Sequence, residues 1–187
     1  MVSIEVGTTA DADAVADLWV ELAESQREFD SHLLPGENRQ QVRESVAQHA
    51  VAGELLVARA DEADPQSASA EADGAHDATD AAGPKEPTDP ELVGFVTFGI
   101  ESSNYDQDVV RGVVRNIYVV PARRGEGIGS ALLDAAEAGL AEAGANVVSL
   151  EVMAENADAR RFYRRHGYAP HRVELEKSVE SDTLTKE

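Results

Sequence analysis

The most informative stretch of the sequence reads Ile117-Tyr118-Val119-Val120-Pro121-Ala122-Arg123-Arg124-Gly125-Glu126-Gly127-Ile128-Gly129-Ser130-Ala131-Leu132-Leu133. Three glycines alternate over five residues, between a Val-rich strand and a helix. Glycine permits positive φ and close backbone approach, so consecutive N–H groups can point into one concavity. The helix N-terminus adds partial positive charge, and Arg123 or Arg124 can supply a full charge at its edge. A tight turn would need only one glycine, so the stretch predicts a pyrophosphate site.

A dinucleotide-binding unit also opens with a strand, glycines and a helix. Glu151 even follows the glycines at about the sequence separation expected of the acid that binds the ribose in such a unit. However, neither Gly125-x-Gly127-x-x-Ser130 nor Gly127-x-Gly129-x-x-Leu132 completes the G-x-G-x-x-G/A pattern. The residues between Pro121 and the glycines lengthen and charge the turn, and the βα units are too few for a doubly wound sheet. A dinucleotide is therefore the less favoured ligand.

The hydrophobic pattern predicts one α/β domain over residues 1–178 with the order β-α-α-β-β-β-α-β-α-β. Adjacent strands without an intervening helix predict a mixed sheet, antiparallel in its first half and flanked by helices. The expected strands are 4–6, 55–58, 92–100, 109–120, 147–152 and 172–177. Four helices are expected. The first begins after a cap at Thr8 or Thr9, and the next two span about 37–50 and 127–143. The fourth lies between an N-cap at Asn156 and a stop at Gly167. The first helix carries an apolar stripe of Val15, Leu18, Trp19 and Leu22.

Residues 61–90 differ abruptly in composition, because they contain no Leu, Ile, Val or aromatic residue. Such a segment cannot bury enough apolar area to offset the entropy of ordering it. It is expected to be a disordered acidic insertion, and a solvated tether is favoured over a functional lid. Residues 179–187 are expected to form a flexible tail.

Thirty-six acidic residues against 16 Lys and Arg give a formal charge of −20. An acidic surface attracts cations and repels nucleic acid. Because the acid is spread over every segment, the favoured interpretation is a halophilic surface tuned to a high-salt cytoplasm, where screening weakens self-repulsion. The charge therefore argues against a nucleic-acid partner and does not choose a substrate.

Other function classes are excluded by what the sequence lacks. There is no cysteine, so disulfides, thiolate metal sites and a covalent acetyl-cysteine are excluded. No two histidines have metal-ligand spacing, so no metal is predicted. No apolar run is long enough for a membrane span and the N-terminus lacks signal-peptide features, which indicates a cytoplasmic protein without a membrane partner.

Two motifs resemble the GCN5-related N-acetyltransferases, known as the GNAT superfamily. Arg124, Gly127 and Gly129 match R/Q-x-x-G-x-G/A of the motif A of this family. Asn156, followed by the run Phe162-Tyr163-Arg164-Arg165-His166-Gly167-Tyr168, resembles its second signature. The resemblance covers roughly residues 92–175, and before that it rests on element order alone.

This resemblance implies where acetyl-CoA binds as the cosubstrate. Its pantetheine arm would pair with the strand at Ile117 and Val119, where two strands separate, and Asn156 would hold the pantetheine amides. A backbone N–H of that strand can polarise the thioester carbonyl. The backbone that would hold the pyrophosphate belongs to Arg124, Gly125, Gly127, Ile128, Gly129 and Ser130.

Two catalytic roles are also implied by the resemblance. Tyr163 would be the general acid that protonates the departing thiolate, although it could instead be a core aromatic. Glu151, at a strand end, would be a base acting through water, although it could equally be a solvated residue or a salt-bridge partner. Glu101 is a weaker candidate for the base.

The resemblance as a whole implies an N-acetyltransferase in which a primary amine attacks directly within a ternary complex. The amine would belong to a small molecule, a protein N-terminus or a lysine. A non-catalytic acyl-CoA-binding regulatory module is the alternative. Many relatives carry a seventh strand, whereas here only a polar segment follows Lys177. The acceptor side is therefore expected to be more open, or completed by a partner subunit of a homodimer.

Overall fold

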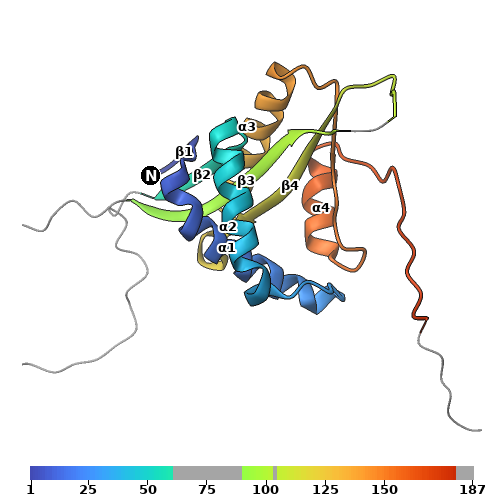
Figure 1. Cartoon of the computed structure of the whole chain (residues 1–187), viewed down its shortest axis with the longest axis horizontal. Helices are drawn as coiled ribbons and strands as arrows, with labels where there is room; N and C mark the ends of the chain where they lie inside the picture. Colours follow the sequence, from blue (N-terminus) through green and yellow to red (C-terminus); the bar gives the residue numbers. More distant parts are fainter. Residues whose placement is uncertain (61–89, 103–104, 180–187) are drawn as a thin grey trace, which may run out of the picture. The chain divides into compact units, whose positions relative to one another are not determined.

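The computed structural model describes residues 1–60, 90–102 and 105–179 (Figure 1). The predicted acidic insertion lies outside the described residues except for Pro90, and the predicted tail lies outside them except for Val179. The chain divides into two compact units, Met1–Met153 and Ala154–Glu187, and each is described by itself.

The first unit contains one five-stranded sheet in the order β1-β2-β3-β4-β5. Its strands are β1 Val2–Val6, β2 Leu55–Ala60, β3 Glu91–Ile100, β4 Arg111–Val119 and β5 Val147–Leu150. The pairings from β1 to β4 are antiparallel, and β4 pairs with β5 in parallel. The predicted mixed sheet, antiparallel in its first half, is confirmed.

Four α-helices and three short 3₁₀ turns accompany the strands in the described residues. They are η1 Thr9–Asp11, α1 Ala12–Gln26, η2 Arg27–Phe29, α2 Pro35–Ala52, η3 Pro121–Arg123, α3 Ile128–Glu142 and α4 Ala157–Arg165. Proline suits the first position of α2, because its missing N–H would have no helical partner there. Gly53 ends α2 in the left-handed conformation, with φ of 73°.

Helices cover both faces of the sheet. Val15, Leu18 and Trp19 of α1 and Val46 of α2 are buried in one cluster with β-strand residues that include Phe95. Figure 1 shows α2 passing in front of β3. On the opposite face, α3 packs closely because two strand glycines leave room for its leucines. A Cβ at Gly94 would lie 3.3 Å from Leu132, and one at Gly112 would lie 2.8 Å from Leu140. The sheet is therefore held between α1 and α2 on one face and α3 on the other.

A polar cluster fixes the start of α1. The Asp11 carboxylate accepts hydrogen bonds from the Thr8 N–H at 2.7 Å and from the Thr8 hydroxyl at 3.0 Å. Arg59 of β2 forms ion pairs with Asp11 and with Glu5 of β1. Burial acts to raise the pKa of Asp11, but the Thr8 N–H and Arg59 together hold that pKa below its usual value. This cluster ties β1, β2 and the helix start together.

The second unit confirms the predicted short helix and contradicts the predicted last strand. Asn156 caps α4 by accepting a hydrogen bond from the Ala159 N–H at 2.9 Å, and Gly167 follows the helix with φ of 87°. Residues 172–177 form no strand. Val173 and Leu175 are 80% and 90% exposed. Two apolar residues among charged neighbours bury too little surface to order this segment, so the expected strand was wrong.

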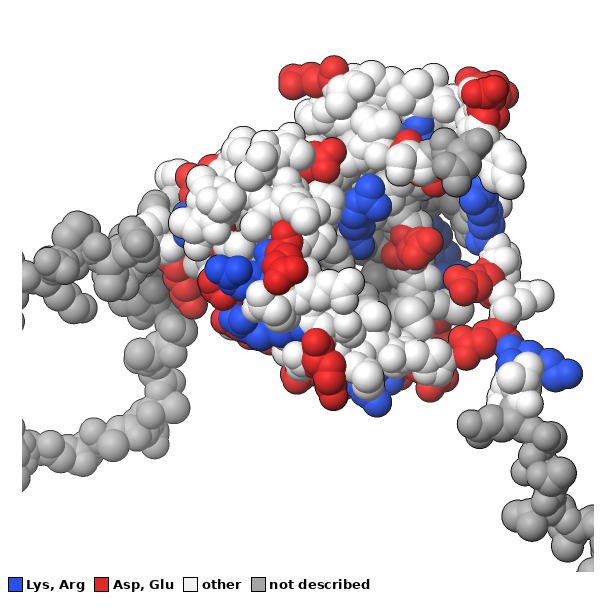
Figure 2. All heavy atoms as spheres, in the orientation of Figure 1, with Lys and Arg blue, Asp and Glu red and all other residues white. Residues whose placement is uncertain are grey.

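Charged side chains are spread over the visible surface rather than gathered in one patch (Figure 2). Over α1 and α2, acidic and basic groups stand side by side, because Arg39 pairs with Asp17 at 2.6 Å and Arg43 pairs with Asp13 at 2.8 Å. Such exposed pairs contribute little to stability. Within the described residues, no helix is both long and apolar enough to cross a membrane.

Candidate active site

Strand β4 separates from β5 partway along its length. Their pairing ends at Val114 and Leu150, whereas β4 continues to pair with β3 as far as Val119. Asn116 lies opposite Thr97 while Val114 lies opposite Phe98, so Arg115 is an extra residue in β4. This is a β-bulge, which bends a strand and increases its twist. From Arg115 onward, one edge of β4 therefore has no strand partner among the described residues of the first unit.

The predicted glycine loop follows β4 directly and has the expected backbone. Gly125 and Gly127 have φ of 87° and 84°, which glycine adopts without strain. Gly127 is the N-cap of α3, and the first helical hydrogen bond runs from the Ala131 N–H to the Gly127 carbonyl at 3.0 Å. The N–H groups of Ile128 and Gly129 precede that bond and are left for another acceptor. A Cβ at Gly125 or Gly127 would meet no atom within 4 Å, so the backbone is open to close approach.

The charges around this loop suit an anion. Arg123 is neutralised by Glu126, since its Nε lies 3.0 Å from both carboxylate oxygens. Arg124 instead donates from Nε to the Val119 carbonyl at 3.0 Å, and its guanidinium lies 5.5 Å from the centre of the Tyr118 ring. Arg124 has no carboxylate partner in the described part of the chain, and the first turn of α3 contains no acid. The loop therefore combines a positive helix end with one uncompensated arginine.

The hydrogen bonds made by Asn116 and Tyr118 of β4 were not anticipated from the sequence. The Trp19 indole donates from Nε1 to Asn116 Oδ1 at 3.1 Å, and Asn116 Nδ2 donates to Thr97 Oγ1 at 3.0 Å. The Tyr118 hydroxyl donates to Glu21 Oε2 at 2.9 Å. Burial, and then the Glu21 carboxylate, raise the pKa of Tyr118 to about 12. No sequence signal could have paired residues that lie 97 positions apart. The one available hint is that Trp19 is the single tryptophan of the chain.

The two carboxylates proposed as bases have different surroundings. Glu151 follows Leu150, the last β5 residue that pairs with β4, and its side chain is exposed. Glu101 Oε2 lies 3.2 Å from Arg111 Nε and accepts a hydrogen bond from Gln107. The Glu101 carboxylate is therefore already engaged by Arg111 and Gln107. Among the described residues, no three His, Asp or Glu side chains gather as a metal site would require.

The second unit carries the other two predicted site residues. Asn156 uses its Oδ1 to cap α4, so its amide nitrogen is the group left for a ligand. Tyr163 lies on α4, where its ring meets that of Phe162 edge-on at 5.3 Å and that of Tyr168 at 5.9 Å. Burial raises the pKa of Tyr163 to about 12. The phenol therefore keeps its proton throughout the ordinary working range of pH.

A family model described as "Acetyltransferase (GNAT) family" matches residues 51–168. The chain belongs to the GNAT family of N-acetyltransferases. Members of this family acetylate amine-bearing substrates, and the fold binds acetyl-CoA.

The individual proteins to which this chain is similar share only a modest part of its sequence. The chain is 32% identical over 89 residues to an aminoalkylphosphonate N-acetyltransferase of Salmonella typhimurium, and the match covers 48% of this chain and 57% of that protein. A GCN5-related N-acetyltransferase from Ralstonia eutropha aligns with a TM-score of 0.63 at 20% identity, over 97% of this chain and all of that one. The PaiA N-acetyltransferase of Thermoplasma acidophilum, solved with coenzyme A, aligns with a TM-score of 0.66 at 16% identity over 93% of both chains. These structural matches establish the fold.

Proposed function

We propose that this chain transfers the acetyl group of acetyl-CoA to a primary amine by direct attack in a ternary complex. The observation that carries the proposal is the continuous arrangement in the first unit: a strand edge without a partner beyond the bulge at Arg115, then two glycines of positive φ, then the N-terminus of α3, which no side chain caps. A free strand edge offers hydrogen bonds to the amides of a pantetheine arm, and a helix N-terminus accepts phosphates.

Each residue of the binding site has a role that fits its surroundings. The backbones of Ile117 and Val119 pair with the pantetheine arm. The pyrophosphate lies against the backbone of residues 124–130 and the side chain of Arg124, whose charge no carboxylate in the described residues cancels. Asn156 contributes its amide nitrogen to the pantetheine, since its oxygen already caps α4.

Acetyl-CoA, when bound, supplies the acetyl thioester. A backbone N–H of β4 donates to the carbonyl oxygen and stabilises the negative charge that develops on it. The neutral amine nitrogen forms a bond to the carbonyl carbon while the C–S bond breaks, and Tyr163 gives its phenolic proton to the departing sulfur. Glu151 accepts the proton that the amine loses, through a water molecule. Tyr163 recovers its proton from solvent.

The acceptor is a small amine, a protein N-terminus or a lysine. The Salmonella relative is named for aminoalkylphosphonates, but the match covers only 57% of that protein, so its substrate is one candidate among several. We further propose that the acidic surface, with its net charge of −20, adapts a cytoplasmic protein to high salt. The same proposal leaves the acceptor side either open or completed by the partner subunit of a homodimer.

The test is a free-thiol release assay with acetyl-CoA and a panel of primary amines in molar KCl. We expect release that depends on the amine. A parallel thermal melt should give a higher Tm with acetyl-CoA and no shift with NAD, because only a ligand of the folded state stabilises it.

The two measurements separate the alternatives. A Tm shift without thiol release for any amine would favour a non-catalytic acyl-CoA-binding module. No shift with millimolar acetyl-CoA would contradict both. A shift with NAD alone would restore the dinucleotide hypothesis.

A further inference from the structure

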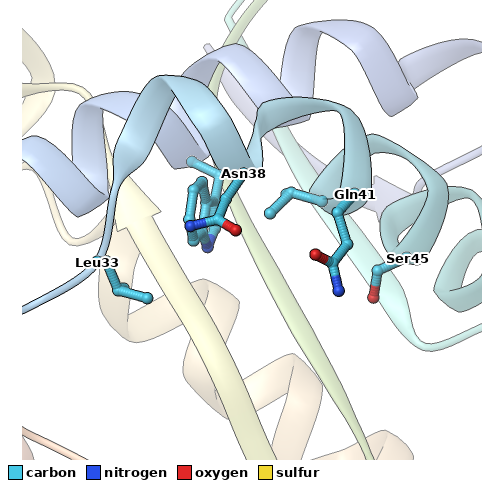
Figure 3. Close-up of a pocket in the computed structure, with 6 residues that line it drawn as sticks. Leu33, Asn38, Gln41 and Ser45 are labelled. Atoms are coloured by element: carbon cyan, nitrogen blue, oxygen red, sulfur yellow. The ribbon is translucent and has the colours of Figure 1, made fainter.

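A hollow of about 240 Å³ lies in the first unit against α1 and α2 (Figure 3). The residues that line it are Trp19, Leu33, Asn38, Gln41, Val42 and Ser45. Four of them stand at positions i, i+3, i+4 and i+7 of α2, so their side chains share one face of that helix. Figure 3 shows Gln41 and Ser45 extending from α2 in the same direction, with Leu33 on the segment that precedes the helix. The hollow therefore has a polar row on α2 beside apolar groups.

Trp19, which lines this hollow, also contacts β4. The Trp19 indole N–H donates to Asn116 Oδ1 at 3.1 Å. Asn116 immediately precedes Ile117, in the part of β4 that has left β5. A group bound in the hollow is thus one side chain away from the strand to which we assign the pantetheine arm.

The lining contains no charged side chain, although 28% of the residues in the chain are charged. The basic residues nearest along α2 are already neutralised, because Arg39 is bound to Asp17 and Arg43 to Asp13. A charged group would therefore find no opposite charge in the lining with which to pair. The lining selects an uncharged occupant.

Hydrogen-bonding groups remain open along the polar row. Asn38 Nδ2 donates to the Leu34 carbonyl at 2.9 Å, which leaves its Oδ1 to accept. The side chains of Gln41 and Ser45 have no hydrogen-bond partner within the described residues, and both residues are exposed. An amide or a hydroxyl group can donate to Asn38 and exchange hydrogen bonds with Gln41 and Ser45, while its carbon atoms lie against Trp19, Leu33 and Val42.

We propose that this hollow binds the uncharged, hydrogen-bonding end of a small primary amine, such as a primary amide, and so selects the acceptor. The inference rests on the proposed acetyl transfer. It assigns specificity to Asn38, Gln41 and Ser45, which no motif identifies.

The test uses three amines of similar length that differ in the group opposite the amine: β-alaninamide, β-alanine and 2-aminoethylphosphonate. Thiol release in molar KCl should favour the amide over both anions by at least about tenfold in kcat/KM. Gln41→Arg should reverse this order by at least about tenfold in favour of an anion. The matched control is Gln40→Arg on the same helix, because Gln40 bonds Glu44 and does not line the hollow. Gln40→Arg should leave the order unchanged.

A second readout does not depend on turnover. Trp19 is the single tryptophan of the chain, so its fluorescence reports directly on the hollow. With CoA present, β-alaninamide should change this fluorescence in a saturable way in the wild type and in Gln40→Arg, and the midpoint should rise at least about tenfold in Gln41→Arg.

The outcomes separate the two proposals. Absence of thiol release with every amine would overturn the proposed function, and the fluorescence titration would still test the hollow. Turnover that prefers an anion in the wild type, or identical profiles for Gln41→Arg and Gln40→Arg, would overturn the assignment of the hollow while acetyl transfer stands.

Discussion

Trp19 of α1 donates its indole hydrogen to Asn116 of β4 at 3.1 Å, joining two residues that are 97 positions apart. The contact holds the first helix against the strand at the position where β4 has just passed its bulge. Asn116 is fixed in turn by its hydrogen bond to Thr97 on β3. The orientation of β4 beyond the bulge therefore depends on a side chain of the first helix.

Removing this donor should lower stability. We expect Trp19→Phe to reduce the free energy of unfolding by about 1–3 kcal/mol, because Asn116 Oδ1 is left without its partner. Urea denaturation followed by circular dichroism measures the change. A double-mutant cycle with Asn116→Ala isolates the pair from the loss of ring area. A coupling energy of zero would mean that the hydrogen bond contributes nothing.

The glycine loop can be tested against a glycine of the same conformation elsewhere. Gly127 and Gly144 have φ of 84° and 93°, and a Cβ at either would meet no atom within 4 Å. Alanine at either position should cost about 1–2 kcal/mol for the left-handed backbone. Only Gly127→Ala should also weaken CoA binding in calorimetry, by about tenfold or more, because its Cβ stands where the phosphates approach. Equal affinities for the two variants would remove the loop from the binding site.

Tyr163→Phe tests the general acid. We expect kcat to fall by about 10²-fold or more while the dissociation constant for CoA changes little. Because burial raises the pKa of Tyr163 to about 12, the phenol should stay protonated and the wild-type rate should not decline up to about pH 11. The measurement is kcat between pH 7 and 11 for both proteins. A decline of the wild-type rate centred near the ordinary tyrosine value of 10, absent from Tyr163→Phe, would contradict the raised pKa.

Glu151→Gln tests the base. The rate at neutral pH should fall by about 10²-fold, and the deficit should shrink as pH rises and the acceptor amine loses its proton without help. Glu155→Gln, an exposed carboxylate four residues later, is the control and should behave as wild type. An undiminished rate in Glu151→Gln would leave Glu151 as a solvated residue.

The Asp11–Arg59 pair predicts how acid affects stability. The folded-state pKa of Asp11 is held below its unfolded value, so its contribution is full above the unfolded pKa and is lost as pH falls through the folded one. Asp11→Asn should therefore be less stable than wild type by about 2 kcal/mol at pH 7, and the two curves should converge in acid. Asp13→Asn, which removes an exposed partner of Arg43, should change little. Parallel curves for Asp11→Asn and wild type across the acid range would contradict the shifted pKa.

Much of the fold could be predicted because its signals are local. The stripe of Val15, Leu18 and Trp19 identified α1, and Asn156 was correctly predicted to cap α4. The prediction of a strand at 172–177 was wrong because the alternation of Val173 and Leu175 describes only one of the two strands that a pairing needs. A strand also needs a neighbour that its own residues do not encode. The catalytic roles of Tyr163 and Glu151 remain predictions.

The glycine loop could be predicted from local sequence, since the positive φ of Gly125 and Gly127 and the start of α3 depend on residues within one turn. Three features depend on tertiary contacts: the point at which β4 stops pairing with β5, the bond between Trp19 and Asn116, and the uncharged hollow against α1 and α2. Backbone preferences act over a few residues, whereas strand register and side-chain pairing depend on contacts between distant segments. The proposed donor site is therefore readable from one motif, whereas the proposed acceptor hollow depends on the packing of the first two helices.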